Sequence, residues 1–111
     1  MKLTMSEKYM FCNQMAMILE SGFSLNQGVT MVYEEMDDKN IKGVLQEVAK
    51  YLDEQVSFSE AIDLTKAFDD YMVNLVKVSE TSGNLDDVMQ SLSEYYARID
   101  DITNKLKQAL T

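Results

Sequence analysis

The chain has 111 residues, of which 10 are Lys or Arg and 19 are Asp or Glu, so its net charge is −9. This charge argues against nucleic acid or an anionic membrane surface as a partner, because both attract basic protein faces. The sequence contains no His and a single Cys, which excludes His-based triads, His-ligated metals, internal disulfides and Cys-rich zinc sites. Hydrophobic residues make up 46%, so the chain suits one small globular domain, and no apolar run approaches the roughly 20 residues that span a bilayer.

Helical periodicity dominates the first third of the chain, and the absence of Pro favours long helices. Ser6 is expected to cap a first helix that ends at Gly22. Ser24 and Gln27 have the spacing of a capping box, which opens a second helix. The apolar faces of these two helices consist of Met10, Phe11, Met15, Ile18 and Leu19, and of Leu25, Val29, Val32 and Met36.

The middle of the chain predicts two more helices separated by polar breaks. Residues 37–40 form the first break, and Ser57 with Glu60 forms a second capping box that opens a short helix. Around residues 68–70 the chain turns again. The expected apolar faces are Ile41, Val44, Leu45, Val48 and Leu52 in the third helix, and Phe58, Ala61, Ile62 and Leu64 in the fourth.

Two further helices complete the prediction. The fifth carries Tyr71, Met72, Leu75, Val76 and Val78 and stops at Ser82 and Gly83. Asn84 is expected to cap a sixth helix over residues 85–110, which is about 39 Å long at about 1.5 Å per residue. Short helices cannot cover that length, so residues 99–110 should project and need another partner. The predicted fold is all-α, a six-helix bundle of antiparallel helical hairpins with a long C-terminal helix.

Carboxylates are the main source of possible chemistry. Most occur as consecutive pairs, and neighbours on a helix point about 100° apart, so a pair does not face one substrate and an enzyme is not expected. Three carboxylates, Glu80, Asp86 and Asp87, flank the turn at Ser82 and Gly83 and could supply oxygen ligands to Ca²⁺ or Mg²⁺. The favoured explanation needs no metal, because Asp86 and Asp87 at the start of a helix interact favourably with its dipole.

Four segments resemble one family in the right order. Residues 79–89 resemble the Gly-Glu-x-Ser-Gly-x-Leu signature of the type II secretion F family, with Glu80, Ser82, Gly83 and Leu85 at the matching positions. Residues 11–25 are similar to that family's opening helix and turn, residues 56–62 to its Gly-x-Ser-Leu-x-Glu-Ala-Leu segment, and residues 105–110 to the run before its first membrane helix. Tight-adherence pilus relatives share a related pattern.

Three positions depart from the family pattern. Ser79 and Gln55 each stand where the family has Gly, and Asp69 stands where it commonly has Pro.

The resemblance implies a non-enzymatic role for the chain. Its family consists of inner-membrane platform proteins of type II secretion, type IV pili and competence pseudopili, with two cytoplasmic six-helix domains separated and followed by membrane helices. Residues 1–111 would be one such cytoplasmic domain of a bacterial membrane protein, cut just before a membrane helix. Expected partners are the assembly ATPase, other inner-membrane assembly proteins, pilins or pseudopilins, and further copies of the chain.

Contacts with a basic partner are expected at two acidic groups, because complementary charge favours fast and specific association. One is Glu80, Asp86 and Asp87, and the other is Glu34, Glu35, Asp37 and Asp38. A free-standing helical adaptor, regulatory or chaperone-like and without a membrane part, is the alternative. A third class, a carboxylate enzyme or a calcium-dependent module, would require a carboxylate cluster in a concave pocket.

Overall fold

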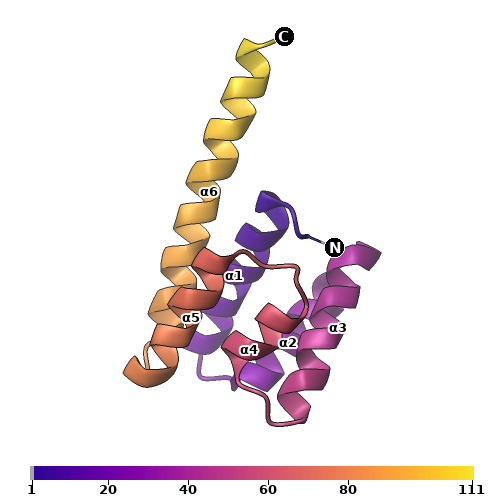
Figure 1. Cartoon of the computed structure of the whole chain (residues 1–111), viewed down its shortest axis with the longest axis vertical. Coiled ribbons are helices and arrows are strands. Elements are labelled where there is room, and N and C mark those ends of the chain that lie inside the picture. The colour runs from indigo at the N-terminus through magenta and orange to yellow at the C-terminus, as the bar shows by residue number, and fades with distance from the viewer. Residues whose placement is uncertain (1) are drawn as a thin grey trace.

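The computed structural model describes residues 2–111 and contains, within them, six α-helices and no strand (Figure 1). This confirms the all-α, six-helix prediction. The helices are α1 (Met5–Glu20), α2 (Leu25–Glu35), α3 (Lys39–Asp53), α4 (Phe58–Leu64), α5 (Asp70–Ser82) and α6 (Leu85–Ala109).

The N-terminus of α1 differs from the prediction, because Thr4 and not Ser6 is its cap. The Thr4 hydroxyl accepts the Glu7 N–H at 3.0 Å, and the Glu7 carboxylate accepts the Thr4 N–H at 2.8 Å. This reciprocal pair satisfies two free N–H groups at once. Ser6 is followed three residues later by Tyr9, which offers no such return bond, so Ser6 lies inside the helix.

The remaining caps follow the sequence with two corrections. Ser24 and Gln27 form the predicted capping box on α2, and Gly83 closes α5 in the left-handed conformation with φ of 73°. Ser57 caps α4 from its hydroxyl, but among the described residues the return bond from Glu60 is missing. Asn84 occupies the N-cap of α6 without a side-chain hydrogen bond within residues 2–111.

In the bundle α1 runs beside α6, α5 packs against α6, and α2 packs between α1 and α3 (Figure 1). The core is formed by side chains of all six helices. The ring of Phe11 lies 6.5 Å from that of Phe58 and 5.7 Å from that of Phe68, measured between centroids. All five residues predicted for the apolar face of α3 are buried. The largest fully buried side chains are Tyr96, Phe11, Met15, Ile41, Leu45, Ile62, Met72, Met89 and Leu92.

Three of the helices bury narrower faces than predicted. Met10 of α1, Leu64 of α4, and Tyr71 and Val78 of α5 remain 38%, 42%, 47% and 61% exposed. In α5 the buried stripe is Met72, Val76 and Ser79. Residues 71 and 78 belong to a neighbouring stripe about 100° around the helix, and Tyr71 stacks on Tyr95 at a centroid distance of 4.4 Å.

The far end of α6 leaves the bundle, as its length predicted (Figure 1). Met89, Leu92 and Tyr96 are fully buried, whereas Ile102, Leu106 and Leu110 are 58%, 60% and 87% exposed. Within residues 2–111, no helix is both long enough and apolar enough to cross a membrane.

One turn carries backbone strain that a substitution can remove. Gln55 follows α3 in the left-handed region with φ of 68°, which costs a residue with a side chain about 1–2 kcal/mol. We expect Gln55→Gly to raise the free energy of unfolding by about 0.5–1 kcal/mol, after the extra freedom of Gly in the unfolded chain is subtracted. Urea titration followed by circular dichroism measures it. Gln46→Gly, inside α3, is the control and should destabilise by about 1 kcal/mol; stabilisation by both or by neither contradicts the account.

Candidate functional site

The glutamate of the signature turn, residues 80–85, is exposed, but its carboxylate contacts the start of α4. The carboxylate of Glu80 accepts the Ser59 hydroxyl at 2.6 Å and the Ser59 backbone N–H at 3.0 Å. Ser59 is only 6% exposed and lies in the first turn of α4. Glu80 therefore caps the N–H of Ser59 in the first turn of α4, a different group from the Ser57 N–H that a capping-box Glu60 would accept, and it ties the end of α5 to the start of α4.

Sequence reasoning assigned Glu80 to a partner surface and missed this contact. The two residues are 21 positions apart, and no local spacing rule joins them. The other signature residues close the same turn: Gly83 adopts the left-handed conformation, Ser82 ends α5 and Leu85 is half-buried against the core.

Asp86 and Asp87 lie in the first turn of α6, where their negative charge interacts favourably with the positive end of the helix dipole. Asp87 is exposed and Asp86 is partly exposed. Within residues 2–111, no three carboxylate or thiol side chains gather closely enough to hold a metal ion. Ca²⁺ or Mg²⁺ binding by these two residues with Glu80 stays a prediction.

The second acidic group, which we call the α2 acidic cluster, consists of Glu34, Glu35, Asp37 and Asp38. All four residues are exposed. Three of them line a hollow of about 250 Å³ together with Glu7, Met10, Met36 and Ile41. None of the four carboxylates forms an ion pair in the part of the chain described. The cluster is therefore an acidic rim around apolar side chains.

The helix dipole adds to the negative potential of the α2 acidic cluster. Glu34 and Glu35 end α2, whose last turn holds no basic residue. Lys42 is close, but its ammonium donates to the Tyr33 carbonyl at 2.9 Å and lies 4.0 Å from the centroid of the Tyr33 ring. Carboxylates at a helix C-terminus oppose the dipole, so Glu34 and Glu35 reduce the stability of the isolated domain.

Neutralising this end of α2 should therefore stabilise the fold. We expect Glu34→Gln with Glu35→Gln to raise the free energy of unfolding by about 0.5–1 kcal/mol at low salt, measured by urea titration. The matched control is Asp86→Asn with Asp87→Asn, which removes two carboxylates from a helix N-terminus and should destabilise by a similar amount. A gain that persists undiminished at high salt would contradict the electrostatic origin.

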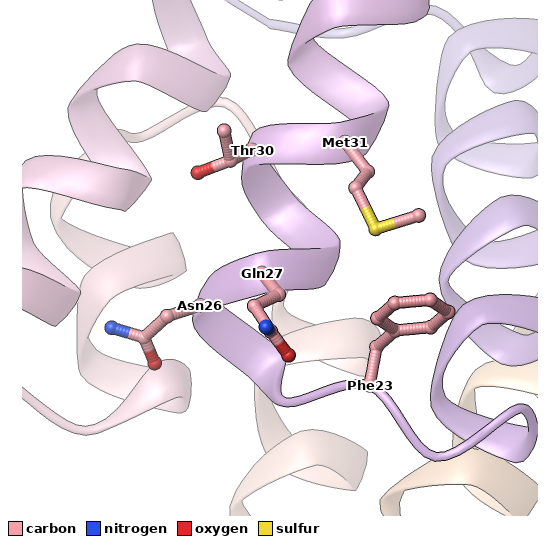
Figure 2. A pocket seen from close by; sticks show the side chains of 5 residues that line it. All are labelled: Phe23, Asn26, Gln27, Thr30 and Met31. Carbon is pink, nitrogen blue, oxygen red and sulfur yellow. The ribbon is translucent and has the colours of Figure 1, made fainter.

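An apolar hollow of about 410 Å³ lies at the other end of α2, lined by Phe23, Asn26, Gln27, Thr30 and Met31. Figure 2 shows the Phe23 ring and the Met31 side chain on the same side of α2. Phe23 is 45% exposed. Phe23 and Met31 therefore offer apolar surface beside this hollow.

A buried charged network joins three helices and was also missed by the sequence analysis. Lys8, which is 6% exposed, donates to Asp69 at 3.0 Å, and the Tyr96 hydroxyl donates to the same oxygen at 2.6 Å. The other Asp69 oxygen accepts the Met72 N–H at 3.4 Å and so caps α5. Amphipathic patterning treats Lys8 and Asp69 as surface residues, and only the assembled helices bring them together.

The network perturbs the ionisation of its members. Burial raises the pKa of the Tyr96 hydroxyl, and the hydrogen bond to Asp69 raises it further. Burial alone would raise the pKa of Asp69, but its hydrogen bonds from Tyr96 and Lys8 outweigh burial and lower that pKa. Burial also raises the pKa of the Cys12 thiol, which contacts Met72 at 3.8 Å between sulfur atoms. At neutral pH the Tyr96 hydroxyl and Cys12 thiol are therefore uncharged, whereas Asp69 is a carboxylate.

Comparison with known proteins places this geometry in context. The family model for type II secretion system (T2SS), protein F, matches residues 11–111. The chain is 29% identical over 101 residues to the type IV pilus assembly protein PilC of Thermus thermophilus, covering 91% of this chain and 25% of that protein. It is 29% identical over 98 residues to the type II secretion system protein F of Vibrio cholerae, covering 87% and 24%.

A third relative is the protein transport protein HofC homolog of Escherichia coli, 26% identical over 99 residues, which are 88% of this chain and 25% of that protein. The chain thus spans about a quarter of the length of the curated relatives that it matches.

Proposed function

Because the chain belongs to the type II secretion system protein F family, we propose that it is a non-enzymatic scaffold domain that couples a cytoplasmic assembly ATPase to the assembly of pilins or pseudopilins. The observation that carries this proposal is the family match over residues 11–111, nearly the whole chain. Relatives of this chain are named for type IV pilus assembly, type II secretion and protein transport.

The projecting end of α6 supports the proposal that the domain lies beside the membrane. Its exposed residues Ile102, Leu106 and Leu110 find no cover within the described domain. Lys105 and Lys107 follow in the same segment, and basic residues are enriched at the cytoplasmic border of membrane helices. We therefore propose that α6 leads toward a membrane helix in the longer protein and that the bundle faces the cytoplasm.

The negative charge of the domain supports binding to a basic partner. The chain's net charge of −9 would steer a basic surface toward the domain. The α2 acidic cluster is free of ion pairs within residues 2–111, and Asp86 and Asp87 lie at an accessible helix start. Glu80 is a weaker candidate because Ser59 occupies its carboxylate. Other inner-membrane assembly proteins and further copies of the chain are additional proposed partners.

The test is co-purification of the full-length protein with the assembly ATPase encoded by the same organism. Reversing charge at the α2 acidic cluster, with Glu34→Lys and Glu35→Lys, or at α6, with Asp86→Lys and Asp87→Lys, should reduce the recovered ATPase by about tenfold, which corresponds to about 1.4 kcal/mol.

The control for charge reversal is Asp53→Lys with Glu54→Lys. These exposed residues end α3, and the change in net charge is identical, so recovery should stay close to that of the unaltered protein. Equal recovery in all three variants would remove both acidic groups from the interface. An equal loss of recovered ATPase in all three variants would show that binding depends on net charge alone and not on these two acidic groups.

A further inference from the structure

The outer face of α2 is largely uncovered and carries both apolar and acidic features. Only Gly28, Val29 and Val32 of its 11 residues are buried. Gly28 holds α2 close against α1, because a Cβ there would lie 2.9 Å from the Met15 methyl carbon. The helix is thus fixed on its inner side and open along its outer side.

The two features of this face share one helical stripe. Gln27, Met31 and Glu34 are spaced four and three residues apart, so they lie on the same side of α2. The stripe begins at the apolar hollow of Phe23 and Met31 and ends at the α2 acidic cluster. From Gln27 to Glu34 the axis advances about 10 Å, which is about two turns of a facing helix.

We propose that the outer face of α2 docks a basic amphipathic helix of a partner protein, with an apolar side chain in the hollow beside Phe23 and Met31 and a Lys or Arg at the α2 acidic cluster. This inference rests on the proposed scaffold function and names the chemistry of the segment that is bound. An apolar anchor and a charged contact in register on one helix are the usual elements of helix-in-groove recognition.

Charge selects the occupant. Four carboxylates and the C-terminal dipole of α2 converge at one end of the stripe, and in residues 2–111 none of the carboxylates is paired. An acidic or neutral helix would leave this potential uncompensated, whereas a guanidinium or ammonium group would neutralise it. A membrane surface does not fit, because anionic headgroups would be repelled by the same carboxylates.

The test uses the full-length protein in its own cells, with the photo-crosslinking amino acid benzoylphenylalanine in place of Met31. The matched control has it in place of Asn74, which is exposed on α5. We expect a protein adduct from position 31 that is absent from position 74, and mass spectrometry should map it to a helical segment with Lys or Arg within about two turns of an apolar residue. Glu34→Lys with Glu35→Lys should lower the adduct yield by about tenfold.

The inference is overturned if the adduct at position 31 forms with an acidic or extended segment, with lipid, or with the α6 end of another copy. It is also overturned if position 31 gives no more adduct than the position 74 control. The identity of the partner separates the two proposals. A basic helix from a protein other than the ATPase supports docking on α2 and refutes the ATPase contact at this face. ATPase co-purification without an adduct at position 31 refutes docking on α2 and leaves the proposed function standing.

Discussion

Replacing Asp69 by Ala is expected to lower the free energy of unfolding by about 3 kcal/mol, because the change leaves a buried charge without its partner. The side chain of Lys8 is 8% exposed, and its ion pair at 3.0 Å is with Asp69. The same substitution removes the acceptor of the Tyr96 hydroxyl and the cap of α5. A total stability of about 5–15 kcal/mol is usual for a domain, so this loss is a large fraction of it.

Urea titration of Asp69→Ala against Asp70→Ala measures this effect. Asp70 is the exposed neighbour and has no side-chain partner within residues 2–111, so its loss should cost under about 0.5 kcal/mol. Equal losses in the two variants would show that the buried network contributes nothing beyond an ordinary surface charge.

The same network sets a dependence of stability on pH. The pKa of Asp69 is lower in the folded domain than its ordinary value, so the folded state binds the Asp69 proton more weakly than the unfolded state. Its contribution is therefore present above the ordinary pKa of Asp and is lost as pH falls through the lowered pKa. Asp69→Asn should flatten the acid limb of the unfolding profile below about pH 4. An acid limb of unchanged steepness in this variant would refute the assignment.

Glu80→Ala is expected to lower the free energy of unfolding by about 2 kcal/mol, because hydrogen bonds to a charged group contribute about 1.5–3 kcal/mol. The substitution leaves the buried Ser59 hydroxyl and N–H without their acceptor. Ser59→Ala removes part of the same interaction. The double variant should therefore lose less than the sum of the two single losses.

The control for Glu80 is Asp87→Ala, which removes an exposed carboxylate at the neighbouring helix start and should cost no more than about 1 kcal/mol. Additive losses for Glu80→Ala and Ser59→Ala would contradict the contact. A functional defect after substitution of Glu80 would follow first from instability, so the charge reversals proposed above leave Glu80 in place.

Local signals in the sequence predicted the elements of the fold well. The capping box at Ser24 and the left-handed Gly83 need only neighbouring residues, and both appear in the structure. All five residues predicted for the apolar face of α3 are buried, because the apolar residues of this segment recur with the 3.6-residue period of a helix and so lie on one face. Errors occurred where a competing local pair existed, as with Thr4 and Glu7 against Ser6.

Contacts between distant residues could not be predicted in this way. Glu80 reaches Ser59 across 21 positions, and Lys8 reaches Asp69 across 61. Both pairs consist of polar residues that amphipathic patterning assigns to the surface. The acidic groups predicted as partner surfaces therefore differ in the structure. The carboxylate of Glu80 is hydrogen-bonded to Ser59, whereas the α2 acidic cluster has no ion pair within residues 2–111.

Equilibrium and kinetic binding of the full-length protein in lipid nanodiscs to the purified assembly ATPase tests most directly whether this domain acts as a scaffold. We predict saturable binding whose association rate falls about tenfold as salt rises from about 50 to about 300 mM. Glu34→Lys with Glu35→Lys should slow association at low salt, while Asp53→Lys with Glu54→Lys should not. The absence of binding, or binding that is indifferent to salt and to all of these substitutions, would contradict the proposed function.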